Sequence, residues 1–335
     1  MSVPVIAFFN NKGGVGKTSL VYHLAWMYAD LGWSVVAADL DPQANLSAMF
    51  LNDDELEDLW ERHKGPVTVY GCLLPLLRGV GDITPPELRI VEDGPALLAG
   101  DLRLSAFEEE LSSQWPACLG GNERAFRVVS AFWRLMQSAA RDRQAQLILL
   151  DLGPNLGSIN RAGLVGADHV VVPLSPDLFS LQGLRNLGPT FQRWRQEWTD
   201  RLARKPPDMD LELPAGRMAP LGYVVLQHGV RLDRPVRAYE KWIERMPGEY
   251  REHVLGQTLR EPLPGDQDPH RLALLKHYHS LMPLAQEAHK PIFHLKPADG
   301  AIGAHALAAQ EVRRDFRALA EEIARRAAIA GPYPA

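Results

Sequence analysis

The chain has 335 residues, 36 Lys and Arg against 41 Asp and Glu, a formal charge of −5 and 46% hydrophobic residues. This apolar content excludes wholesale disorder, and no unbroken apolar run approaches the roughly 20 residues that cross a bilayer. No secretory signal is evident, and Cys72 and Cys118 are too few for a disulfide framework. We therefore expect a soluble, globular, cytoplasmic protein.

The first predicted elements are a strand, a glycine-rich loop and an amphipathic helix. An apolar run over residues 3–9 stops before Lys12, and apolar residues then recur at helical spacing up to Gly32. Glycines between a strand and a helix let backbone N–H groups approach phosphates, and the helix start adds partial positive charge. In such a loop Lys17 reaches the β- and γ-phosphates and the Thr18 hydroxyl binds Mg²⁺. A plain glycine turn is the alternative.

The loop departs from the strict phosphate-loop template at one position, because Asn11 stands where the first glycine belongs. Residues 12–18 read Lys-Gly-Gly-Val-Gly-Lys-Thr, which resembles the deviant Walker A loop of the ParA/MinD superfamily, closest to ParA/Soj-type partition ATPases. This resemblance implies that Lys12 reaches across a nucleotide-sandwich dimer to the partner's ATP. The expected nucleotide contacts of the loop are Lys12, Gly13, Gly14, Val15, Gly16, Lys17, Thr18 and Ser19.

The next predicted strand covers residues 35–38 and ends in Asp39-Leu40-Asp41-Pro42-Gln43-Ala44-Asn45. Carboxylates that follow a parallel strand face the crevice where ligands bind in open α/β sheets. The segment is similar to the superfamily's switch I, which implies that Asp41 orients the attacking water and Asp39 assists near Mg²⁺. Read alone, Asp-Pro-Gln is an ordinary turn.

A third strand over residues 146–150 ends in Asp151 and resembles a Walker B element. The terminal carboxylate of such a strand holds Mg²⁺ through a bound water. Residues 153–157, Gly-Pro-Asn-Leu-Gly, resemble the superfamily's switch II. The resemblance therefore assigns Thr18, Asp39 and Asp151 to the metal, and ATP and Mg²⁺ as cofactors.

Further buried strands are predicted over residues 167–173 and 221–227, with a long helix between them and a helix near the chain end. We expect a single α/β domain over residues 1–330, a doubly wound, mostly parallel sheet flanked by helices. Proline-rich stretches predict insertions near 204–216 and 260–269. Position alone suggests adenine contacts at Gln227, His228 and Pro283.

Three differences from other members of the ParA/MinD superfamily limit which of its subgroups this chain resembles. The loop begins too near residue 1 for an N-terminal helix-turn-helix, and acidic residues interleave with the arginines of the last helix, unlike a membrane tether. Cysteines for an iron–sulfur cluster are missing after Asp151. We expect no membrane partner.

The resemblance implies an ATP-dependent homodimer that binds double-stranded DNA without sequence preference, associates with the nucleoid when ATP is bound, and is stimulated by a ParB-like or other partner. With an acidic chain, the DNA contacts must form a local basic patch. The candidates are Arg185, Arg193, Arg195, Arg231, Arg234, Arg237 and Lys241, each of which is equally explained as a solubilising surface charge.

Two other functions stay open. One is an amidoligase-type synthetase on the same scaffold, which would need a small-molecule pocket. The other is a ParA-like component of conjugation or defence, which would share the chemistry and differ in partner. Lys12 and the Asp-Pro-Gln signature favour the partition-type ATPase.

Overall fold

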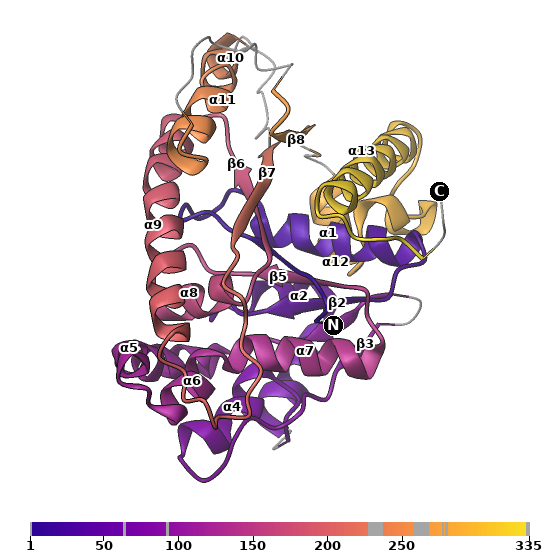
Figure 1. Ribbon diagram of the computed structural model, residues 1–335. Coiled ribbons are helices and arrows are strands. Elements are labelled where there is room, and N and C mark those ends of the chain that lie inside the picture. The colour runs from indigo at the N-terminus through magenta and orange to yellow at the C-terminus, as the bar shows by residue number, and fades with distance from the viewer. Residues whose placement is uncertain are drawn as a thin grey trace.

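An eight-stranded sheet with the order β3-β4-β2-β5-β1-β6-β7-β8 forms the centre of the molecule, and helices cover both of its faces (Figure 1). The computed structural model describes residues 2–62, 65–91, 94–226, 237–257, 268–276, 278 and 281–332. The strands are β1 (Val5–Phe8), β2 (Val35–Asp39), β3 (Arg89–Ile90), β4 (Ala96–Leu98), β5 (Leu147–Asp151), β6 (His169–Leu174), β7 (Ala219–Leu226) and β8 (Arg271–Leu275). Among them only the β3–β4 pair is antiparallel. This confirms the predicted mostly parallel, doubly wound α/β sheet.

Alternate residues of the central strands enter two separate hydrophobic cores. On β1, Val5 and Ala7 pack into one core, whereas Ile6 and Phe8 pack into the other. Successive side chains of a strand point to opposite faces, so a strand that is buried on both sides must be apolar at every position. The unbroken apolar runs in the sequence have this cause.

The helices divide between the two cores. The core that contains Phe8 packs against α1 (Lys17–Asp30), α2 (Asn45–Phe50), α3 (Asp53–Glu57), α12 (Leu281–Glu287) and α13 (Ala304–Arg326). The opposite core packs against α4 (Val69–Leu77), α5 (Phe107–Ala117), α6 (Glu123–Val129), α7 (Ala131–Arg143), α8 (Ser158–Val165), α9 (Leu178–Leu202), α10 (Arg237–Ile243) and α11 (Met246–Glu249).

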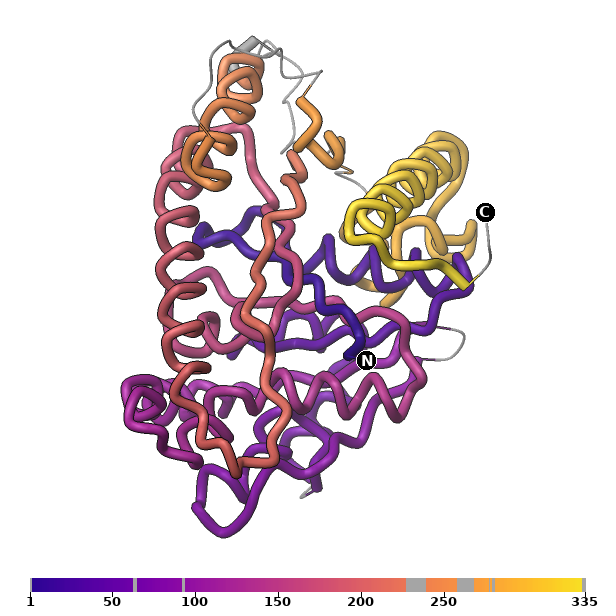
Figure 2. Tube along the Cα trace, in the orientation of Figure 1, coloured from indigo at the N-terminus to yellow at the C-terminus, as the bar shows by residue number. Residues whose placement is uncertain are grey.

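The first predicted insertion lies in the irregular segment that joins the end of α9 to β7 (Figure 2). The Trp198 indole of α9 holds it against the helix by donating to the Pro214 carbonyl at 2.9 Å, and within the segment Lys205 Nζ donates to the Leu211 carbonyl at 2.9 Å. Of the second, only residues 268–269 fall within the described residues. The domain boundaries stay predictions.

Within the described residues, no helix combines the length and the apolar character that crossing a membrane requires.

His23 joins α1 to the C-terminal part of the fold. Its ring is fully buried and stacks on Phe316, with ring centroids 5.0 Å apart. Nδ1 lies 2.7 Å from the Ser19 carbonyl, and Nε2 accepts from the Ile292 N–H at 3.2 Å. One donor and one acceptor define the neutral imidazole. Burial lowers the pKa of His23 to about 4.

This lowered pKa predicts a loss of stability in mild acid. The unfolded chain takes up a proton on His23 below pH 6.5, whereas the folded chain resists it until about pH 4. Stability from His23 is therefore complete above pH 6.5, and about 2 kcal/mol of it is lost between pH 7.5 and 5. Thermal unfolding should be measured at pH 7.5 and at pH 5. The melting temperature should fall more between these two pH values for the wild type than for His23→Gln. Equal decreases would contradict this linkage.

Candidate functional site

The glycine-rich loop lies between β1 and α1, at the carboxyl edge of the sheet. Gly14 and Gly16 have φ of 71° and 85°, a region that favours glycine, and a Cβ on Gly16 would lie 2.9 Å from Leu226 Cδ1. Helix α1 begins at Lys17 and no side chain caps its start. Its first N–H groups therefore point into the loop, which is the arrangement that binds phosphate.

Two neighbouring parallel strands bring the predicted carboxylates to this edge. Asp39 ends β2 and pairs in register with Asp151, which ends β5, while Phe8 of β1 pairs with Asp151 on the other side. Asp41 follows two residues after Asp39. The three predicted segments, far apart in the sequence, therefore meet at one place because parallel strands end at the same edge.

Asp151 has the environment expected of a metal-associated carboxylate. Both of its oxygens are buried, and no hydrogen-bond partner for them occurs among the described residues. Burial, together with the charge of Asp39, raises the pKa of Asp151 well above the usual range. The nearby Thr18 hydroxyl and the positive charge of Lys17 lower this pKa, but by less. An unpaired buried carboxylate is costly unless a cation compensates it. Mg²⁺ accepts hydroxyl and carboxylate oxygens, so Thr18 and Asp151 fit this ion.

Asp39 has a different role in the geometry. Its Oδ2 accepts from both the backbone N–H and the hydroxyl of Ser47, each at 2.8 Å, and its Oδ1 accepts from the Asp41 N–H at 3.2 Å. Burial raises the pKa of Asp39 to about 7, although the hydrogen bonds from Ser47 lower it. A Cβ on Gly100 would lie 2.8 Å from its carboxylate. The Asp39 side chain thus fixes the turn that carries Asp41.

Asp41 faces switch II. Its Oδ1 accepts from the Gln43 N–H at 3.0 Å, and a Cβ on Gly153 would lie 3.1 Å from the same oxygen. Asn160 holds this loop by donating to the Gly153 carbonyl at 2.9 Å and to the Asn155 carbonyl at 2.7 Å. A larger residue at 153 would push the two switches apart, so Gly153 permits their close approach.

Glu108 of α5 ties switch II to the neighbouring helices. Its Oε1 accepts from the Ser158 N–H at 2.5 Å and its Oε2 from the Ile159 N–H at 2.8 Å. These are the first N–H groups of α8, where a negative charge is favourable. Glu108 thus caps the helix that follows switch II, a contact that the sequence alone did not indicate.

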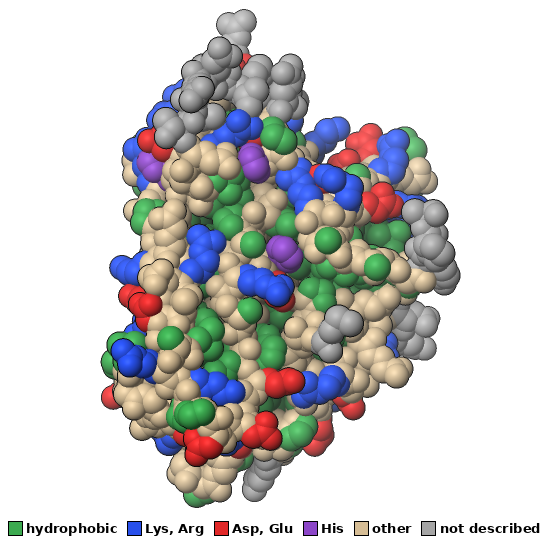
Figure 3. All heavy atoms as spheres, viewed as in Figure 1, with side chains coloured by type: hydrophobic (Ala, Val, Ile, Leu, Met, Phe, Trp, Pro, Cys, Tyr) green, Lys and Arg blue, Asp and Glu red, His purple; other side chains and the backbone are tan. Residues whose placement is uncertain are grey.

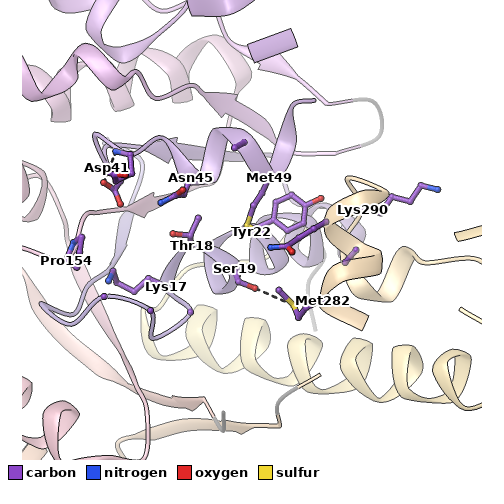
Figure 4. Close-up of a pocket in the computed structure, with 17 residues that line it drawn as sticks. Lys17, Thr18, Ser19, Tyr22, Asp41, Asn45, Met49, Pro154, Met282 and Lys290 are labelled. Atoms are coloured by element: carbon purple, nitrogen blue, oxygen red, sulfur yellow. Dashed lines mark hydrogen bonds between the residues drawn. The ribbon is translucent and has the colours of Figure 1, made fainter. Parts of the chain in front are cut away.

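The loop and both switches open into a cavity of about 550 Å³ (Figure 4). Lys17, Thr18, Asp41 and Pro154 line one end of it. Burial lowers the pKa of Lys17, opposed by the charges of Asp151 and Asp41, and its Nζ donates to the Lys12 carbonyl at 3.1 Å. This end combines backbone N–H groups, a buried cation and carboxylates, the groups that phosphoryl transfer needs.

The far end of the cavity mixes apolar and polar side chains, and the sequence analysis did not predict it. Tyr22 and Met49 line it from α1 and α2, and Met282, Gln286 and Lys290 line it from α12 and the turn after it. The Tyr22 hydroxyl is buried, and none of the residues that the structure describes gives it a hydrogen-bond partner. No sequence motif connects α1 and α2 with α12. Nothing in the sequence therefore indicated that residues of these helices line one cavity.

Of the predicted adenine contacts, only Pro283 lies within the described residues. Gln227 and His228 lie outside the described residues, and Pro283, although on α12, is not among the residues that line the cavity. Its neighbour Met282 occupies that place, because successive residues of a helix point about 100° apart.

Lys12 is not among the residues that line the cavity. Its Nζ forms an ion pair with Asp177 at the start of α9. Its backbone N–H donates to Asn10 Oδ1 at 3.0 Å, which fixes the residue's backbone. In this structure the charge of Lys12 is therefore paired with Asp177.

The predicted basic residues of α9 do not form a free basic surface. Arg185 pairs with Glu249 through two hydrogen bonds of 2.7 and 2.6 Å, and Arg193 lies 3.9 Å from Glu197. Arg195 is half-buried, and its Nη1 donates to a backbone carbonyl at 3.4 Å. On the face shown in Figure 3, Lys and Arg side chains are dispersed among hydrophobic and acidic ones.

The second basic group is only partly described. Lys241 on α10 lies over the Trp242 ring, with Nζ 4.6 Å from its centroid. Arg231, Arg234 and the side chain of Arg237 lie outside the described residues.

Comparison with known families gives a match over more than half of the chain. The sequence model of the AAA_31 family, described as an AAA domain, matches residues 3–204. Among curated proteins, the chromosome partitioning protein ParA of Caulobacter vibrioides is 28% identical over 198 residues, which are 59% of this chain and 66% of that protein. Matches to eight curated relatives span between 42% and 66% of their own length.

Solved structures share the fold over almost the whole chain. Protein DIP2308 of Corynebacterium diphtheriae superposes with a TM-score of 0.68 and 24% identity, covering 97% of this chain and 98% of that one. The structure of pNOB8 ParA bound to nonspecific DNA gives a TM-score of 0.55 and 18% identity, covering 97% and 98%. At these identities the likeness concerns the fold.

Proposed function

This chain belongs to the AAA_31 family, within the ParA/MinD superfamily of P-loop NTPases, and on that premise we propose that it is a partition-type ATPase. In this proposal it binds ATP with Mg²⁺, dimerises around two nucleotides, and hydrolyses ATP slowly. The observation that carries the proposal is the convergence of Lys17, Thr18 and Asp41 on one cavity, with Asp151 buried behind them.

Each residue at the phosphate end has a distinct task. Lys17 and the N–H groups of the loop bind the phosphates, and Thr18 and Asp151 hold the metal, directly and through water. Mg²⁺ bound there supplies positive charge against the phosphate oxygens. Asp41, 6% exposed and beside Gly153, orients the water that attacks the terminal phosphate.

The far end of the cavity takes the nucleoside. Met49 and Met282 offer polarisable surfaces for a base, and the Tyr22 hydroxyl and the Gln286 amide supply hydrogen-bonding groups. In this proposal Met282 and Gln286, which lie on the same helix as Pro283, take the place of Pro283 as contacts of the nucleoside. Gln227 and His228 stay predictions.

Lys12 acts on the partner's nucleotide. Its side chain does not line its own cavity, so its charge is available at the face where the loop is exposed. A cation that arrives from a second subunit stabilises charge on the transferring phosphoryl group in the manner of an arginine finger. Hydrolysis in this proposal therefore requires the dimer.

The dimer binds duplex DNA without sequence preference and positions DNA or another cargo, with a ParB-like protein or another partner as activator. The fold shared with pNOB8 ParA, which was solved bound to nonspecific DNA, and the partitioning role of the Caulobacter relative support this proposal. Association with the nucleoid in the ATP state follows from it.

Size-exclusion chromatography with ATP, ADP or no nucleotide, each with and without random duplex DNA, tests this function. We expect a dimer only with ATP and Mg²⁺, and co-elution with DNA only in that state. DNA binding should weaken steeply as salt rises, since it releases counterions from the phosphates. A monomer under all three conditions, or DNA binding that is equal with and without ATP, would count against the proposal.

A further inference from the structure

Asp177, the residue before α9, uses its two carboxylate oxygens for two different partners. Oδ1 accepts from the Ser180 N–H at 2.9 Å and so caps the start of the helix. Oδ2 forms the ion pair with Lys12 Nζ. One oxygen therefore serves the fold, while the other restrains the lysine that defines the deviant loop.

The first turn of α9 adds a second contact to Lys12. Its Nζ lies 5.9 Å from the centroid of the Phe179 ring, within reach of a cation–π interaction. Phe179 is 71% exposed and Leu178 is 45% exposed, so this turn presents apolar surface beside the ion pair. The Lys12 and Asp177 side chains are 27% and 35% exposed. An ion pair this accessible to water is weak enough to exchange partners.

We propose that Asp177 is a positioning residue that holds Lys12 within its own subunit until a second ATP-bound subunit arrives. Dimerisation then exchanges the Asp177 carboxylate for a phosphate oxygen on the partner's nucleotide, and the lost ion pair sets the concentration at which the dimer forms. This inference rests on the proposed function, because it requires Lys12 to act across the dimer. No covalent step is involved.

The exchange occurs twice in a symmetric dimer, so the effect of Asp177 is doubled. Exposed ion pairs contribute little each, and the loss of two corresponds to about a two- to thirtyfold change in the dimer dissociation constant. Removing the Asp177 charge should therefore tighten the ATP-dependent dimer by about this factor.

Asp177→Asn separates the two roles of the side chain. Asparagine keeps an oxygen that accepts from the Ser180 N–H and is itself a good N-cap, but it carries no charge for Lys12. Asp177→Ala loses both roles and reports the cost of the cap. Asp200→Asn, near the other end of α9, removes the same charge away from Lys12 and is the matched control.

Sedimentation equilibrium with Mg²⁺ and adenylyl imidodiphosphate, which is not hydrolysed, gives the dimer dissociation constants. We expect Asp177→Asn to dimerise at lower concentration with an unchanged melting temperature, and Asp200→Asn to match the wild type. An unchanged or weaker Asp177→Asn dimer, beside a wild type that dimerises, overturns the inference but leaves the proposed function intact. A wild type that stays monomeric overturns both.

Amine labelling of the nucleotide-free chain gives a readout independent of dimerisation. Acetylation of Lys12 by acetic anhydride, followed by mass spectrometry, should be faster in Asp177→Asn than in the wild type. Lys290, which pairs with Asp299 elsewhere, should react equally in both. Equal rates at Lys12 would overturn the restraint.

Discussion

Lys17→Ala is expected to abolish ATP binding at concentrations where the wild type is saturated. Lys17 is 7% exposed and lies at the phosphate end of the cavity, so its charge acts in a medium poor in water. Charge-assisted hydrogen bonds to phosphate contribute about 1.5–3 kcal/mol each, and without Lys17 the charges of Asp41 and Asp151 oppose the phosphates unbalanced. Calorimetric titration with ATP and Mg²⁺ should show affinity reduced by about a hundredfold or more.

Lys12→Ala is the matched control, because Lys12 belongs to the same loop but does not line the cavity and pairs with Asp177 instead. It should bind ATP with nearly wild-type affinity and fail to form the dimer. Wild-type affinity in Lys17→Ala would refute the phosphate-binding role of the loop.

Asp41→Ala should keep ATP binding and lose hydrolysis, so that the ATP-bound dimer accumulates. The Asp41 carboxylate lines the phosphate end of the cavity, and groups that position or deprotonate an attacking water contribute about 10²- to 10⁴-fold in rate. Phosphate release and size-exclusion chromatography on the same sample check both parts of this result.

Asp41→Asn distinguishes chemistry from local structure. Its amide oxygen can still accept from the Gln43 N–H, so the turn is retained while the charge is lost. We expect the same loss of hydrolysis as in Asp41→Ala. Recovery of hydrolysis in Asp41→Asn would assign Asp41 to the turn, and an ATP-bound but monomeric Asp41→Ala would contradict a trapped dimer.

The predicted basic surface stays a prediction, and the structure shows one reason why sequence alone could not place it. Spacing along α9 grouped Arg185, Arg193 and Arg195, but Glu249 comes from a segment more than 60 residues later and pairs with the first of them. A pattern of like charges does not reveal the opposite charges that the fold brings beside it. The dependence of DNA binding on ATP therefore tests the nucleic-acid proposal more directly than any one arginine.

Asp39 illustrates a different limit. The sequence placed it correctly at the end of a strand, yet could not distinguish a metal ligand from a buried carboxylate that braces a turn. The hydrogen bonds from Ser47, and the close approach of Gly100 from a distant segment, show that Asp39 braces the turn, and its role near Mg²⁺ stays a prediction. Asp151, of the same type and strand position, has no hydrogen-bond donor within the described ranges.

Local patterns in the sequence predicted the strands β1, β2, β5, β6 and β7 and the phosphate loop, because apolar runs and a glycine-rich loop between a strand and a helix are visible along the chain. The short strands β3, β4 and β8, the α12 residues that line the far end of the cavity, and the pairing of Asp177 with Lys12 were visible only in the fold. The cavity lining and the Asp177 pairing join segments more than 160 residues apart, and such pairings depend on how the helices pack on the sheet rather than on any spacing along the chain.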